Sequence, residues 1–177
     1  MSTPRTPDPG MLVISVLSAD WDAFWPEVQA VLTERFGPFQ ASEPFPFVET
    51  DYYDEELGAP ITRRLLAFDE LRPLDELADV KLWTNGLERR FARDGRRLFN
   101  LDPGFLTQQS LVLATGKNFS HRVYLKDGIW ADLTLMWQRK HWVDFPWTFP
   151  DYAGEAMKTR LTKLRLSYKT MLSKPQT

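Results

Sequence analysis

The stretch MLVISVL, residues 11–17, decides the fold class. It is a short apolar run, rich in β-branched residues and bounded by polar ones, which is typical of a buried β-strand. Residues 21–36 follow with large apolar side chains at helical spacing, and Gly37-Pro38 is expected to end this helix. Residues 45–50 and 61–68 have the composition of two further strands.

The next segments complete a β-α-β-β-α-β order. A second helix is expected to begin at Pro73, because proline suits the first helical position, and its apolar stripe runs to Phe91. Asn85-Gly86 lies inside this stripe and could divide the helix into two pieces. Residues 96–101 then predict a strand that ends in a turn at residues 102–104, Asp-Pro-Gly. This order is the split βαβ pattern of ferredoxin-like folds.

The remaining segments predict three strands and a final helix. The strands are expected at residues 110–115, 119–125 and 129–138, with Asp127-Gly128 forming a hairpin turn between the last two. The predicted fold class is therefore α+β. We expect a flexible tail at residues 1–10 and a single domain at residues 11–177, built from a mainly antiparallel sheet with helices on one face. It combines a ferredoxin-like βαββαβ core with a C-terminal β-hairpin and helix.

Composition excludes some site classes and leaves the partner open. The 177 residues include no cysteine, which excludes disulfides, zinc–thiolate sites and cysteine nucleophiles. No stretch reads as a signal peptide or reaches the roughly 20 apolar residues of a membrane span, so a cytoplasmic location without a membrane partner is expected. Residues 1–80 hold 16 acidic against 5 basic residues, and residues 81–177 hold 8 against 17. This asymmetry indicates either a basic surface for an anionic partner or acidic and basic elements packed together.

Several common chemistries lack their motifs. The pair Gly116-Lys117 does not form a P-loop, because Leu111 stands where glycine is needed and Asn118 where Ser or Thr is needed. No Gly-x-Gly-x-x-Gly run supports a Rossmann cofactor site. Ser120 and His121 are neighbours on a predicted strand, so they point to opposite faces and cannot act as nucleophile and base. Two histidines make a histidine-rich metal site improbable, which leaves magnesium on carboxylates as the metal to consider.

Two polar constellations remain. Asp51-Tyr52-Tyr53 follows the second predicted strand and could bind a polar ring or cation, or simply fill space and solvate a loop. In the hairpin, a two-residue loop places Asp132 near His121 as an acid–base pair. A three-residue loop with a bulge instead places Asp132 opposite Arg122 as an ion pair.

Basic residues also gather at the end of the second predicted helix and along the last one. These residues could contact a phosphate or a nucleic acid, or could only be solvated. The two sets are Arg89, Arg90, Arg93, Arg96 and Arg97, and Lys158, Arg160, Lys163, Arg165 and Lys169.

Five separate segments resemble one protein family. They are TDYY (50–53), NLDPG (100–104), LAT (113–115), SHRVY (120–124) and PWTFPDY (146–152). Together they resemble the uncharacterised prokaryotic domain-of-unknown-function family DUF-4416, over about residues 11 to 170. Members are often automatically named "GTP-binding protein", but this chain has neither a P-loop nor an Asn-Lys-x-Asp guanine motif. The resemblance implies no catalytic role; it favours the polar residues of these segments as site residues.

The leading functional prediction is a small module that binds a polar or anionic ligand, a nucleotide being one candidate. Its expected ligand-binding residues are Tyr52, Tyr53, Asn100, His121, Arg122 and Asp132. One alternative is a magnesium-dependent or acid–base enzyme with Asp51, Asp102 or His121 as catalytic candidates. Another is a module that binds RNA or an acidic protein through its basic helix faces.

Overall fold

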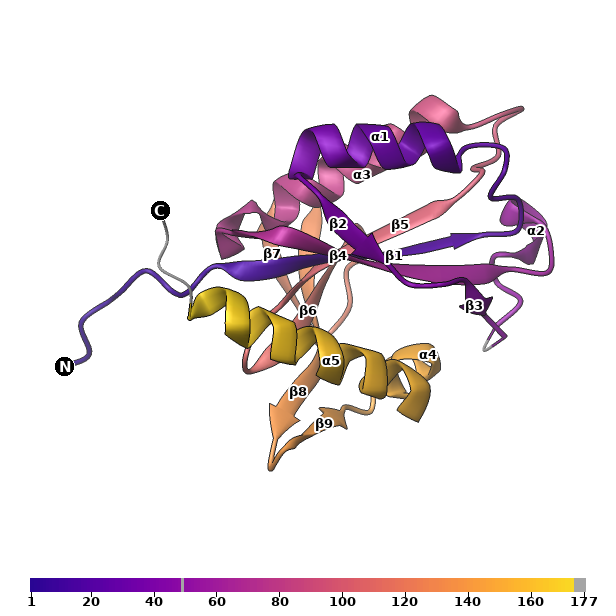
Figure 1. The fold of residues 1–177 in the computed structure, drawn as a ribbon. Helices are drawn as coiled ribbons and strands as arrows, with labels where there is room; N and C mark the ends of the chain where they lie inside the picture. The colour runs from indigo at the N-terminus through magenta and orange to yellow at the C-terminus, as the bar shows by residue number, and fades with distance from the viewer. Residues whose placement is uncertain (49, 174–177) are drawn as a thin grey trace.

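The computed structural model describes residues 1–48 and 50–173 of the chain. Within these residues nine antiparallel strands form one sheet, whose main path has the order β2-β4-β1-β5-β6-β8-β7 (Figure 1). The strands are β1 (Gly10–Ser18), β2 (Phe39–Ala41), β3 (Phe45–Pro46), β4 (Thr62–Arg72), β5 (Asn100–Leu106), β6 (Ser110–Thr115), β7 (Arg122–Lys126), β8 (Ile129–Gln138) and β9 (His141–Asp144). Off the main path, β3 pairs with β4 and β9 pairs with β8. The predicted α+β class with a mainly antiparallel sheet is confirmed.

The helices cover both faces of the sheet. They are α1 (Trp25–Phe36), α2 (Asp54–Leu57), α3 (Leu77–Phe91), α4 (Pro150–Ala153) and α5 (Glu155–Leu172), with a short 3-10 turn at Leu74–Glu76 before α3. In Figure 1, α1 and α3 lie on one side of the sheet and α5 with α4 on the other. The expectation that all helices lie on one face is therefore wrong.

Strand β1 shows why both faces need a cover. Leu12, Ile14 and Val16 belong to the core cluster under α1 and α3. Met11 and Val13 point the opposite way, into the cluster that includes Leu161 of α5. Because side chains alternate along a strand, a nearly continuous apolar run such as residues 11–17 buries both faces, and each needs its own layer of helices.

The strand order interleaves two split βαβ units. Strand β4 lies between β1 and β2, which flank α1 in the chain, and β1 lies between β4 and β5, which flank α3. This interleaving agrees with the predicted β-α-β-β-α-β order, and the ferredoxin-like assignment itself stays a prediction.

The largest local correction concerns residues 102–104, the expected Asp-Pro-Gly turn. These residues continue β5, pairing with β1 in register from Asp102↔Ser15 to Gly104↔Val13. The reason is that a proline is tolerated in a strand where its missing N–H faces no partner strand. On its other edge β5 pairs with β6 only from Gly104 onward, so Pro103 lies just beyond that pairing.

Other boundaries differ by a few residues. Of the predicted strand at residues 45–50, Phe45–Pro46 forms β3, while residue 49 lies outside the described residues. The short edge strand β2 was missed. Helix α1 begins at Trp25, four residues later than the predicted helix, with Pro26 in its first turn. Helix α3 continues through Asn85 and Gly86, because its buried face packs against the sheet on both sides of that pair.

Candidate functional site

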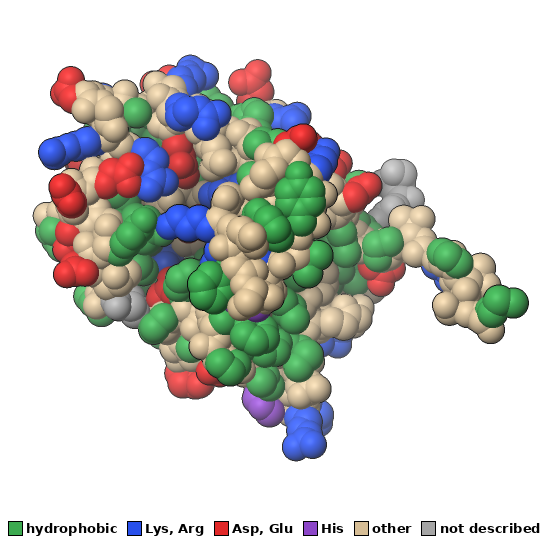
Figure 2. All heavy atoms as spheres, turned by 180° about the vertical axis from the view of Figure 1, so that it is seen from behind, with side chains coloured by type: hydrophobic (Ala, Val, Ile, Leu, Met, Phe, Trp, Pro, Cys, Tyr) green, Lys and Arg blue, Asp and Glu red, His purple; other side chains and the backbone are tan. Residues whose placement is uncertain are grey.

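A cleft of about 780 Å³ opens where β5 and β6 separate. The two strands pair only through residues 104–106 and 111–113, while β6 continues along β8 to Thr115. Gly104 permits the close approach at the last pair, because a Cβ there would lie 2.6 Å from the Val112 carbonyl oxygen. Seen from behind, the molecule is hollowed, with lysine and arginine side chains in and beside the hollow (Figure 2). The cleft therefore begins where β-sheet pairing ends.

Two side chains of α3 take over the hydrogen bonds that a neighbouring strand would make to β5. The Glu88 carboxylate accepts from the Leu101 backbone N–H at 2.5 Å, and the Lys81 ammonium donates to the Leu101 carbonyl at 2.8 Å. Buried backbone groups need such partners when sheet pairing stops. Since alternate residues of a strand direct their backbone groups to the same edge, Pro103 leaves no donor unpaired on this open edge.

The same two α3 residues reach further into the cleft. Lys81 is 7% exposed, lines the cleft and lies 3.2 Å from Asp102 Oδ1. Sequence reasoning missed both side chains. The signal was present, because Leu77, Lys81, Thr84 and Glu88 recur at intervals of four, three and four residues, on the buried face of the helix. Charged side chains on a buried stripe mark a position where the core carries polar contacts.

Arg97 is the centre of a polar network at one end of the cleft. Its Nε and Nη2 donate to the two carboxylate oxygens of Glu56 at 2.6 and 2.7 Å, which ties α2 to the sheet. Its Nη1 donates to Glu88 at 3.1 Å and to Asn100 at 2.7 Å. Asn100 in turn donates to Asp102 at 2.7 Å. All three guanidinium nitrogens of Arg97 therefore donate hydrogen bonds to other groups of the protein.

The network moves its carboxyl pKa values in opposite directions. Hydrogen bonds from Arg97 lower the pKa of Glu56 below its ordinary value. Burial raises the pKa of Glu88, against the lowering effects of Lys81, the Leu101 N–H and Arg97. Hydrogen bonds to Glu56 raise the pKa of Arg97, which keeps the guanidinium charged.

Arg63 of β4 forms a second buried centre on the cleft wall. Its side chain is 4% exposed, and its guanidinium lies over the rings of Phe47 and Tyr152, 4.8 and 5.2 Å from their centres. Its Nη2 donates to Asp151, so it also fastens α4 to the sheet. Within residues 1–48 and 50–173, no acceptor is found for its Nε–H.

The hairpin adopts the register with a bulge. Arg122 pairs with Asp132, and the register shifts between Tyr124 and Lys126. Arg122 Nε donates to Asp132 Oδ2 at 2.8 Å, which is the ion pair that the three-residue-loop alternative predicted. The three-residue loop itself is wrong, because Lys126 pairs with Ile129 and the extra residue is a bulge at Leu125 within the strand. His121 also approaches the same oxygen, with its Nε2 at 3.1 Å. Asp132 therefore contacts both side chains, so the contact with His121 and the ion pair with Arg122 are present together.

Tyr52, Tyr53 and Lys117 form the mouth of the cleft. Lys117 Nζ lies 3.2 Å from the Tyr52 hydroxyl and 4.9 Å from the centre of its ring. Tyr53 packs edge-on against Tyr52, with ring centres 5.0 Å apart. Burial and the charge of Asp102 raise the pKa of Tyr53 to about 12, so its phenol stays protonated at neutral pH. Burial also raises the pKa of Tyr152 above its usual range.

Most of the predicted site residues lie together around this cleft. Its lining includes Tyr52, Tyr53, Asn100, Asp102, Arg122 and Asp132. Two candidates do not line it: Asp51 is exposed, and His121 stands behind Asp132, stacked on Trp147 at 5.0 Å between ring centres. The functional roles of all these residues stay predictions.

Comparison with known proteins identifies the family. A family model described as "Domain of unknown function (DUF4416)" matches residues 8–168. The chain belongs to this family. Neither the curated proteins nor the solved structures contain a match.

The five segments that carry the family resemblance meet at one place in this DUF4416 domain. Each contributes side chains to the lining of the cleft, although they are spread over residues 50–152 of the chain. Representative members, one from each segment, are Tyr52, Asn100, Thr115, Arg122 and Asp151. The segments come from a loop, three strands, and the turn before α4 together with the start of that helix, so only the folded chain brings them together.

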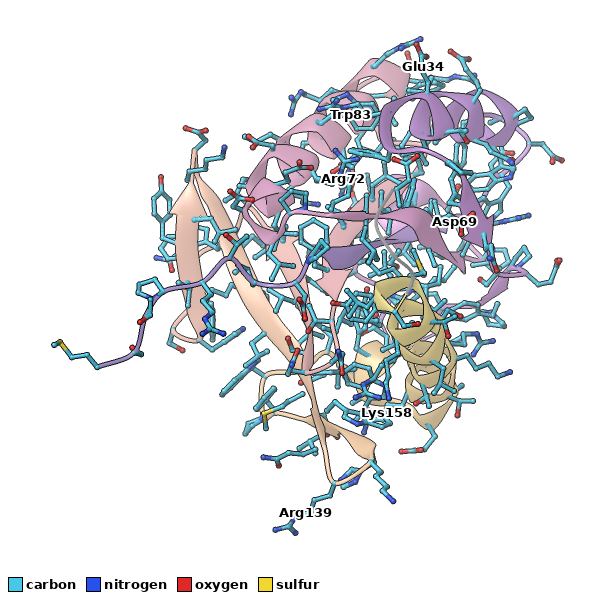
Figure 3. The ribbon with its side chains drawn as sticks, turned by 60° about the vertical axis from the view of Figure 1, so that its left-hand side comes forward. Glu34, Asp69, Arg72, Trp83, Arg139 and Lys158 are labelled. Atoms are coloured by element: carbon cyan, nitrogen blue, oxygen red, sulfur yellow. The ribbon has the colours of Figure 1, made fainter. Side chains whose placement is uncertain are left out.

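The structure also bears on the metal and basic-surface predictions. In the part of the chain that the structure describes, no three His, Asp or Glu side chains come together as a metal site. On α5, Lys158 pairs with Asp144 at 2.6 Å, while Arg139 extends from the tip of the β8–β9 hairpin (Figure 3). The guanidinium groups of Arg160 and Arg165 lie on the rings of Phe45 and Trp137, at 4.0 and 4.2 Å from their centres. Much of the basic helix surface thus makes internal contacts.

The same residues contain no candidate membrane helix. None of the described helices has the length and apolar character needed to cross a bilayer.

Proposed function

We propose that this DUF4416 domain binds a small anionic ligand in the cleft between β5 and β6. The observation that carries the proposal is the convergence of the five family segments on one charged cleft. Segments far apart in sequence that supply polar side chains to one concave site are typical of ligand binding. We also propose that the protein acts in the cytoplasm.

The lining of the cleft includes five lysine and arginine side chains, and four of them form ion pairs with carboxylates. The pairs are Arg63–Asp151, Lys81–Asp102, Arg97 with Glu56 and Glu88, and Arg122–Asp132. Lys117, in contrast, forms no ion pair with any described residue. An anionic group near Lys117 would gain a charge-assisted hydrogen bond without displacing a carboxylate.

Arg63 provides a second indication. A buried guanidinium ordinarily uses its N–H groups in hydrogen bonds, and one left without an acceptor is costly. The Nε–H of Arg63 has no protein acceptor among the described residues, although the side chain lines the cleft. After a small movement of the Arg63 side chain, a ligand oxygen in the cleft would supply this missing acceptor.

The size of the cleft fits a ligand of this kind. Its volume of about 780 Å³ lies within the roughly 300–1,000 Å³ of small-molecule sites. Nucleotides stay among the candidates, bound without a P-loop, together with phosphorylated metabolites and organic acids. Magnesium would then enter with the ligand's own phosphate oxygens rather than on a ready-made set of carboxylates.

A thermal-shift screen tests the proposal. Inorganic phosphate, citrate, ATP and GTP, each with and without magnesium, are compared at constant ionic strength. A ligand at a hundredfold its dissociation constant stabilises the protein by about 2.7 kcal/mol, which raises Tm by roughly 5–11 °C. Lys117→Met should weaken the response. The matched control is Lys126→Met, because Lys126 is exposed and pairs with Asp79 away from the cleft.

Two results would count against the proposal. One is a screen in which no anion changes Tm. The other is a response that Lys117→Met and Lys126→Met reduce equally, since that would reflect general surface charge rather than the cleft.

A further inference from the structure

The cleft has a charged interior and an aromatic mouth. Arg63, Lys81 and Asp132 on its walls are between 3 and 7% exposed. Two other lining residues, Tyr52 and Phe149, are 66 and 51% exposed. Large rings that line a cleft and still face water are available to a ligand as it enters.

The two rings come from different segments of the chain. Tyr52 precedes α2, in the loop after β3, and Phe149 immediately precedes α4, in the loop after β9. Phe149 has no aromatic ring packed on it among the described residues. Tyr52 meets Tyr53 edge-on, and Lys117 lies over its ring. The cleft lining therefore combines two exposed aromatic rings with Lys117, for which no described residue supplies a carboxylate partner.

A single exposed aromatic residue needs no functional explanation. Here, however, two of them line the same cleft, and one carries Lys117 against its ring. A flat ring with an anionic substituent matches this arrangement, because the ring can stack on an aromatic side chain while the substituent reaches the ammonium group. A ligand without a ring would leave both side chains exposed to water.

We propose that the ligand is an aryl or heteroaryl anion, with its ring held at the mouth by Phe149 and Tyr52 and its phosphate or carboxylate held by Lys117. This inference rests on the proposed function and specifies its ligand class. It places the ring outside the ion pairs of the cleft lining and the anion at the entrance to them.

Calorimetric titration with three simple probes tests the inference. Phenyl phosphate, glucose 6-phosphate and inorganic phosphate share the anion and differ in what it is attached to. Phenyl phosphate should bind about tenfold more tightly than glucose 6-phosphate, which lies in the lower part of the range for stacking a ring on an aromatic side chain. Benzoate and acetate repeat the comparison for carboxylates.

Variants assign the preference to the mouth. Phe149→Ala should reduce the tenfold preference to less than threefold while leaving the affinity for inorganic phosphate unchanged. The matched control is Phe119→Ala, because Phe119 is 62% exposed and does not line the cleft. Tyr52→Ala provides a second test, independent of any effect of Phe149 on α4, and Tyr52→Phe should retain the preference because it keeps the ring.

The outcomes separate the inference from the proposed function. One outcome is that both phosphate esters bind equally to the wild-type protein, or that Phe149→Ala and Tyr52→Ala both keep the preference. In that case the inferred aromatic binding site for the ring is wrong, while the proposed anion site is not contradicted. If none of the anions binds, both are wrong. A preference that disappears in Phe149→Ala and persists in Phe119→Ala supports both.

Discussion

Strand β5 has a different kind of neighbour along each edge. On one edge it pairs with β1 through seven consecutive residues, from Met11↔Leu106 to Leu17↔Asn100. On the other edge it pairs with β6 through three residues and then separates from it. Along the β1–β5 pairing, the closed seam, the side chains belong mainly to the apolar core. The β5–β6 pairing, the open seam, ends at the charged cleft. The comparison teaches that the site occupies the place where backbone pairing stops and side chains of α3 take over its hydrogen bonds.

The closed seam should carry the largest energetic effect. Ile14 is fully buried between its partners Pro103 and Leu66, so Ile14→Ala removes methyl groups from a packed core and leaves a cavity. We expect the free energy of unfolding to fall by about 2–5 kcal/mol, measured by urea denaturation. The control Val123→Ala lies on a strand but is 67% exposed, and should change it by less than about 0.5 kcal/mol. Similar losses in both variants would mean that the β1–β5 seam is not the rigid part of the protein.

The open seam should depend on its polar network. Arg97→Met leaves Glu88, which is 6% exposed at its side chain, without one of its charged partners, and releases Glu56 of α2. We expect a loss of about 3 kcal/mol in the free energy of unfolding, since removing one member of a buried ion pair leaves the other uncompensated.

The control for this prediction is Arg90→Met. Arg90 pairs with Glu27, but both side chains are more than 60% exposed, and such pairs contribute about 0–1 kcal/mol. If Arg97→Met costs no more than Arg90→Met, the network does not hold the open seam together.

A smaller effect is expected at the point where the two strands separate. Gly104→Ala places a Cβ 2.6 Å from the Val112 carbonyl oxygen, so β5 and β6 must move apart. Such overpacking costs about 1–3 kcal/mol and should also change the affinity for whichever anion binds the cleft. Gly116→Ala is the matched control, because no atom lies within 4 Å of its added Cβ. Equal stability of the two variants would show that the close approach at Gly104 is not needed.

The smallest expected effect is the difference between Glu88 and Glu56 in how each contributes to the free energy of unfolding as the pH changes. A carboxyl with a raised folded pKa contributes most below its unfolded pKa, and this contribution is lost as the pH rises through the folded value. The stability of the wild-type protein relative to Glu88→Gln should therefore decrease from about pH 4 to pH 7, because burial raises the pKa of Glu88. A lowered pKa has the opposite consequence.

Glu56→Gln provides that opposite case within the same network. Because Arg97 lowers the pKa of Glu56, the stability of the wild-type protein relative to Glu56→Gln should increase over the same pH range. Urea denaturation at several pH values measures both slopes. Two slopes of the same sign would contradict the assignment of opposite pKa shifts.

Local patterns in the sequence determined much of this protein. They determined the α+β class, the strands β1, β6 and β8, the Asp127-Gly128 hairpin and the absence of a P-loop, because each depends on residues close together in the chain. The sequence left two registers of this hairpin open, and the structure combines the two-residue loop of one with the Arg122–Asp132 pairing of the other. The nearly continuous apolar run of β1 also carried the information that both faces are buried, although the prediction placed helices on only one.

Only the tertiary structure decided where the chemistry lies. Arg63 meets Asp151 across 88 residues, and Lys81 and Glu88 reach β5 from a helix on the opposite face from α4. Pro103 belongs to a strand rather than a turn because β6 turns away beside it. Sequence patterns describe which face of one element is apolar, but a polar cleft forms where two elements fail to pair, and that depends on the packing of the whole sheet.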